Sequence, residues 1–213
     1  MERTPNLHAI HTYVRDKSVD NDTFLFALER LVNLVVQFAL VYVRYHPTDV
    51  VTPTDSTFHG AKLDTCISVV TITRTGDIFE TAIRNHIPIS SYGKIVIHQE
   101  SRSSMKQGPR LYYAKLSPDI KDPNSTVLLF DGVLSTGNAV NMAIQVLLDH
   151  GVRQENIMLV CLVAAPDGLY RLVTFYPKIT IIVSWVDDSI DHRGYAVPGI
   201  GYLGDRYFGT PIQ

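Results

Sequence analysis

Cysteine is scarce in this sequence, with only Cys66 and Cys161 among 213 residues. Both lie in apolar stretches typical of strands, so we expect buried, reduced thiols and no disulfide. No cysteine or histidine spacing is typical of a metal site. The first residues, MERTPNL, are polar and predict no secretory signal. These absences favour a cytoplasmic protein.

The chain has no large excess of charge of either sign, because its formal net charge is −2 at neutral pH. We therefore expect neither nucleic acid nor a membrane surface as a partner, although a local basic site fits the same value. The hydrophobic content of 46% is ample for a core. Residues 1–213 are expected to form a single domain.

An uninterrupted apolar run of about 20 residues is also absent. The nearest stretch, 23–43, predicts a helix that Asn21 or Asp22 caps and that ends near Val43. Its apolar character is interrupted by Glu29, Arg30, Asn33 and Gln37. We expect a helix buried on most sides, in part by another subunit, and a membrane span is the lesser alternative.

Three motifs of phosphate and nucleotide enzymes are missing or misplaced. The P-loop pattern G-x-x-x-x-G-K-[ST] does not occur, so P-loop kinase chemistry is not supported. Residues 199–204 match G-x-G-x-x-G, but they have no room for the helix and strand that a dinucleotide site requires. Residues 130–134 are similar to the first motif of haloacid-dehalogenase-like phosphatases, yet Leu129 stands where the nucleophilic aspartate belongs.

The most informative stretch is 127–138, VLLFDGVLSTGN. Its apolar start predicts a buried strand over 127–130 that ends at Asp131, and a helix is predicted from Ala139 to about His150. The loop between them is rich in small hydroxyl residues and opens the helix, whose free N–H groups and dipole favour an anion. Asp131 is placed to accept hydrogen bonds from sugar hydroxyls, so a sugar phosphate fits. An ordinary strand-to-helix turn with a polar cap explains the same residues.

The remaining pattern alternates strands with helices, which predicts an α/β fold with a parallel central sheet flanked by helices. Strands are expected at 67–73, 92–98, 157–164 and 180–184, and helices at 78–84 and 167–175. A β-hairpin or arm is expected at 49–63, a mobile loop at 99–110 and a further β-arm at 111–116. Ligands of such sheets bind beyond the carboxyl ends of the strands. Arg74, the 99–110 loop and the 131–138 loop should therefore share one edge.

Several ordered motifs then match one family. Residues 11–17, HTYVRDK, resemble H-T-x-x-R-D-K of the uracil phosphoribosyltransferases, and residues 72–76, ITRTG, resemble their I-x-R-A-G. Residues 162–168, LVAAPDG, are similar to L-V-A-A-P-E-G, and residues 197–201 and 204–210 are similar to the closing P-G-x-G and G-D-R-x-F-G-T. The closest resemblance is to the uracil phosphoribosyltransferase-like region that follows uridine kinases.

The resemblance implies a type I phosphoribosyltransferase fold with a β-arm, an N-terminal arm at 1–20 and a C-terminal hood at 185–213. It implies transfer of ribose 5-phosphate from phosphoribosyl pyrophosphate to uracil, giving UMP and pyrophosphate. Magnesium would accompany the pyrophosphate with no direct protein ligand. GTP activates some members of the family and is a candidate activator here. The apolar helix at 23–43 and the β-arm favour a homo-oligomer, a dimer or larger. A uridine kinase is the partner expected if the chain is a regulatory homologue.

The same resemblance assigns the site. Asp131 and Arg74 would be the catalytic residues, holding the ribose hydroxyls and the pyrophosphate. The donor substrate would contact Arg74, Gln99, Asp131, Ser135, Thr136, Gly137, Asn138 and Ala139. Main-chain groups of the hood would hold uracil at Ala196, Gly201, Tyr202 and Leu203.

Several positions depart from the family pattern. In D-P-x-x-A-T-G-G-[ST] the second glycine is Asn138 and the final hydroxyl residue is Ala139. Gln99 takes the place of a second arginine, which Arg102 would replace if the loop shifts, and Tyr202 takes the place of an aspartate in the hood. Losing one transition-state contact commonly costs on the order of 3 kcal/mol. A homologue without turnover, acting as a nucleotide-binding or regulatory partner protein, is therefore the alternative function.

Overall fold

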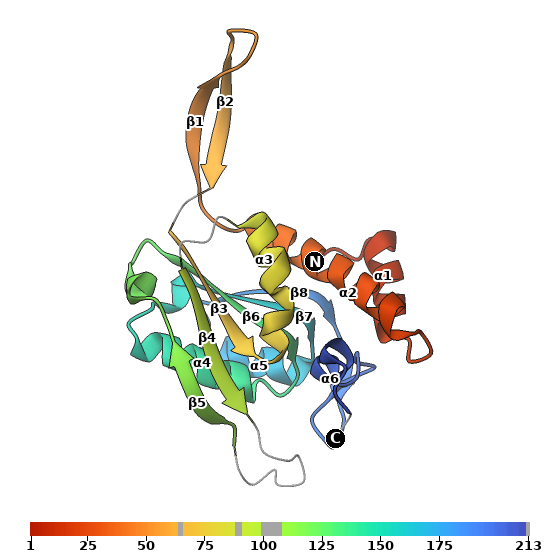
Figure 1. The fold of residues 1–213 in the computed structure, drawn as a ribbon. Helices are drawn as coiled ribbons and strands as arrows, with labels where there is room; N and C mark the ends of the chain where they lie inside the picture. Colours follow the sequence, from red (N-terminus) through yellow and green to blue (C-terminus); the bar gives the residue numbers. More distant parts are fainter. Residues whose placement is uncertain (64–65, 88–90, 99–107, 212–213) are drawn as a thin grey trace.

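The computed structural model describes residues 1–63, 66–87, 91–98 and 108–211, and its main sheet has six strands in the order β5-β4-β3-β6-β7-β8 (Figure 1). The strands are β3 (Ile67–Thr73), β4 (Ser91–His98), β5 (Arg110–Lys115), β6 (Thr126–Leu134), β7 (Ile157–Ala164) and β8 (Thr180–Val186). The predicted parallel arrangement is confirmed for five strands. The segment expected to be a second arm is instead β5, an antiparallel edge strand beside β4.

Helices cover both faces of this sheet, which explains why its central strands are apolar throughout. One face packs against α1 (Pro5–Arg15), α2 (Asn21–Leu40) and α3 (Glu80–His86). The other face packs against α4 (Asn138–Asp149) and α5 (Pro166–Phe175). Short 3-10 turns lie at Thr75–Phe79 (η1), Pro118–Lys121 (η3) and Gln154–Asn156 (η4). The arrangement is a three-layer α/β fold, as the sequence predicts.

The long apolar helix is α2, and its bounds differ slightly from the prediction. Asp20 is the N-cap, because its side chain accepts a hydrogen bond from Thr23 N, and the helix ends at Leu40. Among the described residues, α2 is also the one helix that is long and apolar enough to cross a membrane, a test that a buried core helix passes as well. Within the fold, its inward side packs with α1 and the sheet, through residues such as Leu28, Leu31 and Val35.

A β-hairpin projects from the body of the molecule (Figure 1). Its strands β1 (Tyr45–Val51) and β2 (Thr57–Leu63) pair in antiparallel register and confirm the predicted hairpin, which begins four residues earlier than expected. Val51 and Phe58 on this hairpin are largely exposed. Neither cysteine forms a disulfide within the described residues; Cys161 is buried, whereas Cys66 is only partly buried.

The end of the chain folds back over the carboxyl edge of the sheet as the predicted hood. It contains the short strands β9 (Ser189–Ile190) and β10 (Ala196–Val197) and the helix α6 (Leu203–Phe208). The N-terminal helices hold it in place: Arg15 donates to Gly199 O at 2.8 Å, and Arg206 donates to Val14 O at 2.7 Å. The N-terminal segment therefore positions the hood above the sheet.

Candidate functional site

Asp131 lies inside β6, not in the loop after it, which corrects the predicted end of that strand. Its backbone pairs with Cys161 of β7, and its side chain is buried. Asp131 Oδ1 accepts a hydrogen bond from Thr75 Oγ1 at 2.5 Å. Burial raises the pKa of Asp131 to about 6, and the bond from Thr75 acts in the opposite direction. The carboxyl is thus mostly ionised at pH 7 and able to accept hydrogen bonds from sugar hydroxyls.

The loop after β6 opens α4, as predicted. Gly137 is the N-cap at φ +78°, a left-handed conformation that favours glycine, and α4 has no side-chain cap. Thr136 Oγ1 accepts a long bond from Asn138 N at 3.4 Å. Residues 133–140 and Asp131 line an open pocket of about 80 Å³. The N–H groups of the first turn of α4 and the Asp131 carboxyl therefore face the same pocket.

Helix α5 packs tightly against this loop. It places Arg171 beside the loop, a residue that the sequence analysis does not assign to the site. A Cβ on Gly168 would lie 2.5 Å from Ser135 O, so only glycine allows this approach. Arg171, one turn further along α5, donates from Nη1 to Asn138 Oδ1 at 2.7 Å. No local motif marks Arg171, because its partner is 33 residues away.

Arg74, the predicted pyrophosphate ligand, follows β3 at the same edge of the sheet. Its guanidinium forms an ion pair with Asp205 of α6, and Nη1 donates to Thr210 Oγ1 at 3.3 Å. The guanidinium carbon lies 5.5 Å from the Phe208 ring centre. The Arg74 side chain is still 46% exposed. The hood thus holds Arg74 at the mouth of the site while leaving part of it open.

The hood reaches the loop at two points. The side chain of Leu203, which is buried, packs so closely on β6 that a Cβ on Gly132 would lie 2.5 Å from Leu203 Cδ2. A Cβ on Gly194 would lie 3.1 Å from Thr136 Cγ2. Two of the predicted uracil positions, Gly201 and Leu203, lie at the start of α6 beside this contact.

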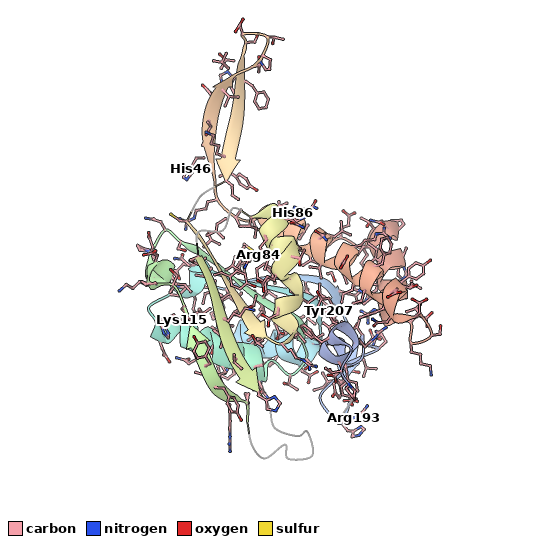
Figure 2. The ribbon with its side chains drawn as sticks, in the orientation of Figure 1. His46, Arg84, His86, Lys115, Arg193 and Tyr207 are labelled. Carbon is pink, nitrogen blue, oxygen red and sulfur yellow. The ribbon has the colours of Figure 1, made fainter. Side chains whose placement is uncertain are left out.

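The other two predicted uracil positions, Ala196 and Tyr202, are held by contacts within the hood. Ala196 is buried in β10. The Tyr202 ring packs edge-on against Tyr195 at 4.6 Å between centroids, and its hydroxyl accepts a bond from Arg193 at 3.4 Å. Figure 2 labels Arg193 at the outer end of the hood. Tyr202 is therefore fixed by aromatic packing where the family pattern has a carboxylate.

A model of the family "Uracil phosphoribosyltransferase" matches residues 1–210. The chain belongs to the uracil phosphoribosyltransferase family. This finding confirms the resemblance that the ordered motifs indicate, and it covers the arm, the sheet and the hood alike.

Curated relatives of this family member are of two kinds. A uracil phosphoribosyltransferase of Dictyostelium discoideum is 34% identical over 207 residues, which are 96% of this chain and 92% of that protein. Uracil phosphoribosyltransferase 1 of Schizosaccharomyces pombe is 32% identical over 99% of this chain and 94% of that protein. The uridine/cytidine kinase UKL1 of Arabidopsis thaliana is 35% identical over 99% of this chain. The chain spans only 42% of that kinase relative's length.

Solved structures show the same fold. A protein from Aquifex aeolicus superposes with a TM-score of 0.85 at 23% identity, covering 100% of this chain and 98% of that chain. The APRTase of Giardia lamblia, solved with 9-deazaadenine, has a TM-score of 0.53 at 14% identity, over 87% of this chain and 99% of that chain. The fold is that of the type I phosphoribosyltransferases, as predicted.

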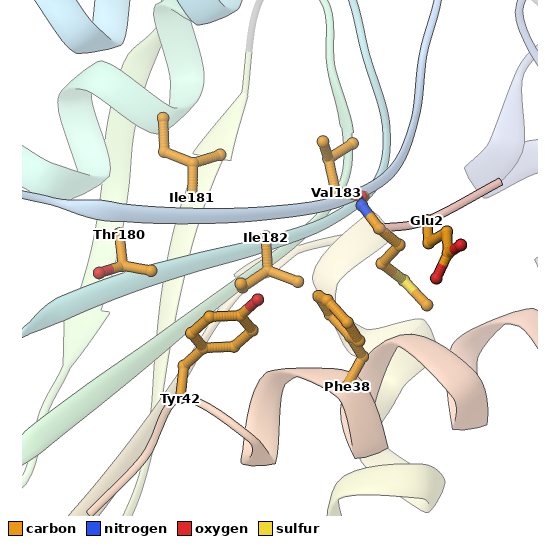
Figure 3. Close-up of a pocket in the computed structure, with 8 residues that line it drawn as sticks. Glu2, Phe38, Tyr42, Thr180, Ile181, Ile182 and Val183 are labelled. Atoms are coloured by element: carbon orange, nitrogen blue, oxygen red, sulfur yellow. Dashed lines mark hydrogen bonds between the residues drawn. The ribbon is translucent and has the colours of Figure 1, made fainter.

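Two further regions bear on the site of this phosphoribosyltransferase-family chain: the loop with Gln99 and a second cavity. Gln99, and Arg102 as its substitute, lie outside the described residues. A larger cavity of about 390 Å³ lies between the end of α2 and β8, where Phe38, Tyr42 and Ile182 line it (Figure 3). Its lining includes no residue of the predicted site, whereas the smaller pocket places the Asp131 carboxyl and the start of α4 around one space. The smaller pocket therefore fits a sugar phosphate better.

Proposed function

We propose that this chain transfers ribose 5-phosphate from phosphoribosyl pyrophosphate to uracil, giving UMP and pyrophosphate. The observation that carries the proposal is the pocket in which the Asp131 carboxyl and the uncapped start of α4 face the same space. An ionised carboxylate accepts bonds from the ribose hydroxyls, while helix N–H groups donate to the 5-phosphate. A ribose phosphate needs both contacts, on opposite ends of one small molecule.

The leaving group requires positive charge beyond the ribose. As pyrophosphate departs, the anomeric carbon becomes oxocarbenium-like and the leaving oxygens gain charge. Arg74 would donate to them from the exposed part of its guanidinium. No group of three His, Cys, Asp or Glu side chains that could hold an ion occurs in the described part of the chain. We therefore propose that magnesium enters on the pyrophosphate itself.

Uracil would lie under the hood. The contact of Leu203 with β6 brings the main chain of 201–203 next to the strand that holds Asp131. Main-chain N–H and C=O groups there would read the uracil edge, and the buried Ala196 would close the pocket from the side. Holding both substrates in line and excluding water supplies much of the rate enhancement.

A second candidate function is ligand binding without turnover. It is favoured by the ion pair of Arg74 with Asp205, which the pyrophosphate would have to displace, and by Tyr202 in place of an acid. In that case the domain would bind a nucleotide and regulate a partner, for which a uridine kinase is our proposal. Both candidates use the pocket at Asp131, so they differ only in turnover.

The deciding experiment incubates labelled uracil with phosphoribosyl pyrophosphate and magnesium and measures UMP. We expect UMP from the natural chain and at least a hundredfold less from Asp131→Asn, which removes the charge but keeps the shape. Asp119→Asn, an equal change at an exposed position, is the matched control.

The outcomes separate the candidates. UMP formation that depends on Asp131 and not on Asp119 supports the transferase. Binding of phosphoribosyl pyrophosphate by calorimetry, with UMP no higher than in Asp131→Asn, overturns the transferase and supports the binding protein. Neither binding nor UMP overturns both.

A further inference from the structure

Helix α5 approaches the loop more closely than a side chain would permit. Gly168 faces Ser135, and Gly168 Cα would lie 3.3 Å from a Cβ on Gly137. Two glycines, one on each side of the contact, therefore bring the first turn of α5 directly onto the loop. Because residues three apart share a helix face, Arg171 projects over the same loop as Gly168.

Arg171 carries a charge that no described carboxylate compensates. Within the described residues its side chain donates to Asn138 Oδ1 at 2.7 Å and forms no ion pair. A guanidinium has five N–H donors, so one bond to Asn138 leaves most of them free. The residue is exposed. An anion in the loop would therefore find a charged donor at its rim.

The same bond also orients Asn138. Arginine offers donors only, so the amide atom that faces Arg171 is the oxygen. The amide nitrogen of Asn138 is then the atom available to the pocket, which Asn138 itself lines. Arg171 thus turns the side chain of the first residue of α4 into a second donor for an anion.

We propose that Arg171 binds the 5-phosphate of the sugar substrate, directly through its guanidinium and indirectly by orienting Asn138. Together the two side chains select a phosphorylated ribose over an unphosphorylated one. This inference rests on the proposed function, because it takes the loop as the 5-phosphate site. It adds a charged side chain from α5 to the 5-phosphate site, which the sequence predicts within residues 135–139 alone.

The test compares two ligands that differ in the group Arg171 would contact. Ribose 5-phosphate carries the 5-phosphate, whereas magnesium pyrophosphate lacks it. Calorimetry on Arg171→Gln should show affinity for ribose 5-phosphate lowered by roughly 10- to 100-fold, the range expected for a lost charge-assisted hydrogen bond. Affinity for magnesium pyrophosphate should stay within about twofold. Arg171→Lys, which keeps the charge but not the fork, should give an intermediate value.

Arg84→Gln is the matched control, because it removes the same charge from a distant surface. Arg84 lies on α3 (Figure 2). It forms an ion pair with Glu80 on the same helix. We expect this variant to bind both ligands as the natural chain does. If the control loses as much affinity as Arg171→Gln, the effect is one of net charge and the proposal is overturned.

The outcomes also separate this inference from the proposed function. Equal binding of ribose 5-phosphate by the natural chain and Arg171→Gln overturns the role of Arg171 and leaves the transfer of ribose intact. A selective loss in Arg171→Gln, with no UMP formed by the natural chain, supports Arg171 and overturns the transfer. A natural chain that binds no ribose 5-phosphate overturns the inference together with the loop site.

Discussion

The Asp131 carboxyl is buried within β6, and burial raises its pKa from the ordinary 3.8 to about 6. The folded chain therefore keeps a proton on Asp131 at pH values where the unfolded chain has released it. The resulting stabilisation is fully present below pH 3.8 and is lost as the pH rises through about 6. At neutral pH the fold carries an ionised, largely desolvated carboxylate.

The raised pKa of Asp131 predicts how Asp131→Asn changes the stability of the fold. At pH 7.5 the variant should unfold with a free energy up to about 3 kcal/mol higher than the natural chain, the value of the pKa difference. Near pH 4 the two should be equal. Urea unfolding at both pH values checks this, with Asp119→Asn as the exposed control. A variant less stable than the natural chain at pH 7.5 would show that hydrogen bonds to the ionised form outweigh its desolvation.

At the residue scale, the sequence predicts what local chemistry makes visible. Asp131, Gly137 and the loop between them are marked by adjacent residue types, and the structure brings them into one pocket. Arg171 is not marked, because its contact with Asn138 depends on how α5 crosses the loop. The hydrogen bond from Thr75 to Asp131 was also not predictable, since Thr75 lies in another segment.

At the scale of elements, Gly168 tests how α5 is held against the loop. Helix propensity alone predicts that Gly168→Ala would stabilise α5 by about 1 kcal/mol. The packing predicts the opposite, because the new Cβ would lie 2.5 Å from a backbone oxygen and 3.0 Å from Leu134 Cγ. We expect a loss of about 1–3 kcal/mol in the free energy of unfolding. Affinity for ribose 5-phosphate should fall at least tenfold as α5 and Arg171 move away.

The control for this variant lies on the same helix. Val173 is 52% exposed, so Val173→Ala should change stability by less than about 0.5 kcal/mol. Urea unfolding and calorimetry on both variants give the comparison. If Gly168→Ala is as stable as the natural chain and binds ribose 5-phosphate equally well, α5 is free to adjust and the tight contact is not required.

Strands with an uninterrupted apolar pattern were predictable from the sequence, whereas elements with polar or exposed residues were predicted less well. Strand β3 was predicted with its correct bounds. Strand β6 was predicted too short, because a polar residue within a buried run was taken as its end. Helix α1 was not predicted at all, although Leu7, Ile10 and Val14 have helical spacing and Thr4 caps its start. Strand β5 was predicted as an arm because its exposed pattern conceals its pairing with β4.

At the scale of the whole molecule, contacts between the two ends of the chain hold the hood. Arg15 Nη2 lies 2.8 Å from Asp187 Oδ1, and the Asp187 side chain is completely buried. Asp187 Oδ2 also accepts a bond from Gly199 N at 3.0 Å. Arg15 and Asp187 are more than 170 positions apart in the sequence, so no local pattern predicts their contact. The hood depends on this buried pair for its position.

Arg15→Met tests that dependence. Removing one partner of a buried ion pair leaves an uncompensated charge, so we expect the free energy of unfolding at pH 7.5 to fall by about 3–5 kcal/mol. Arg15→Met with Asp187→Asn should recover more than half of this loss, because the amide carries no charge and its oxygen still accepts from Gly199. Urea unfolding of both variants, with Arg84→Met as the surface control, measures the two steps. If the single and double variants are equally unstable, the methionine side chain itself disrupts the packing of the hood, and the unpaired Asp187 carboxylate is not the cause. Recovery would instead identify the charge at Asp187 as the reason that the start of the chain must carry an arginine.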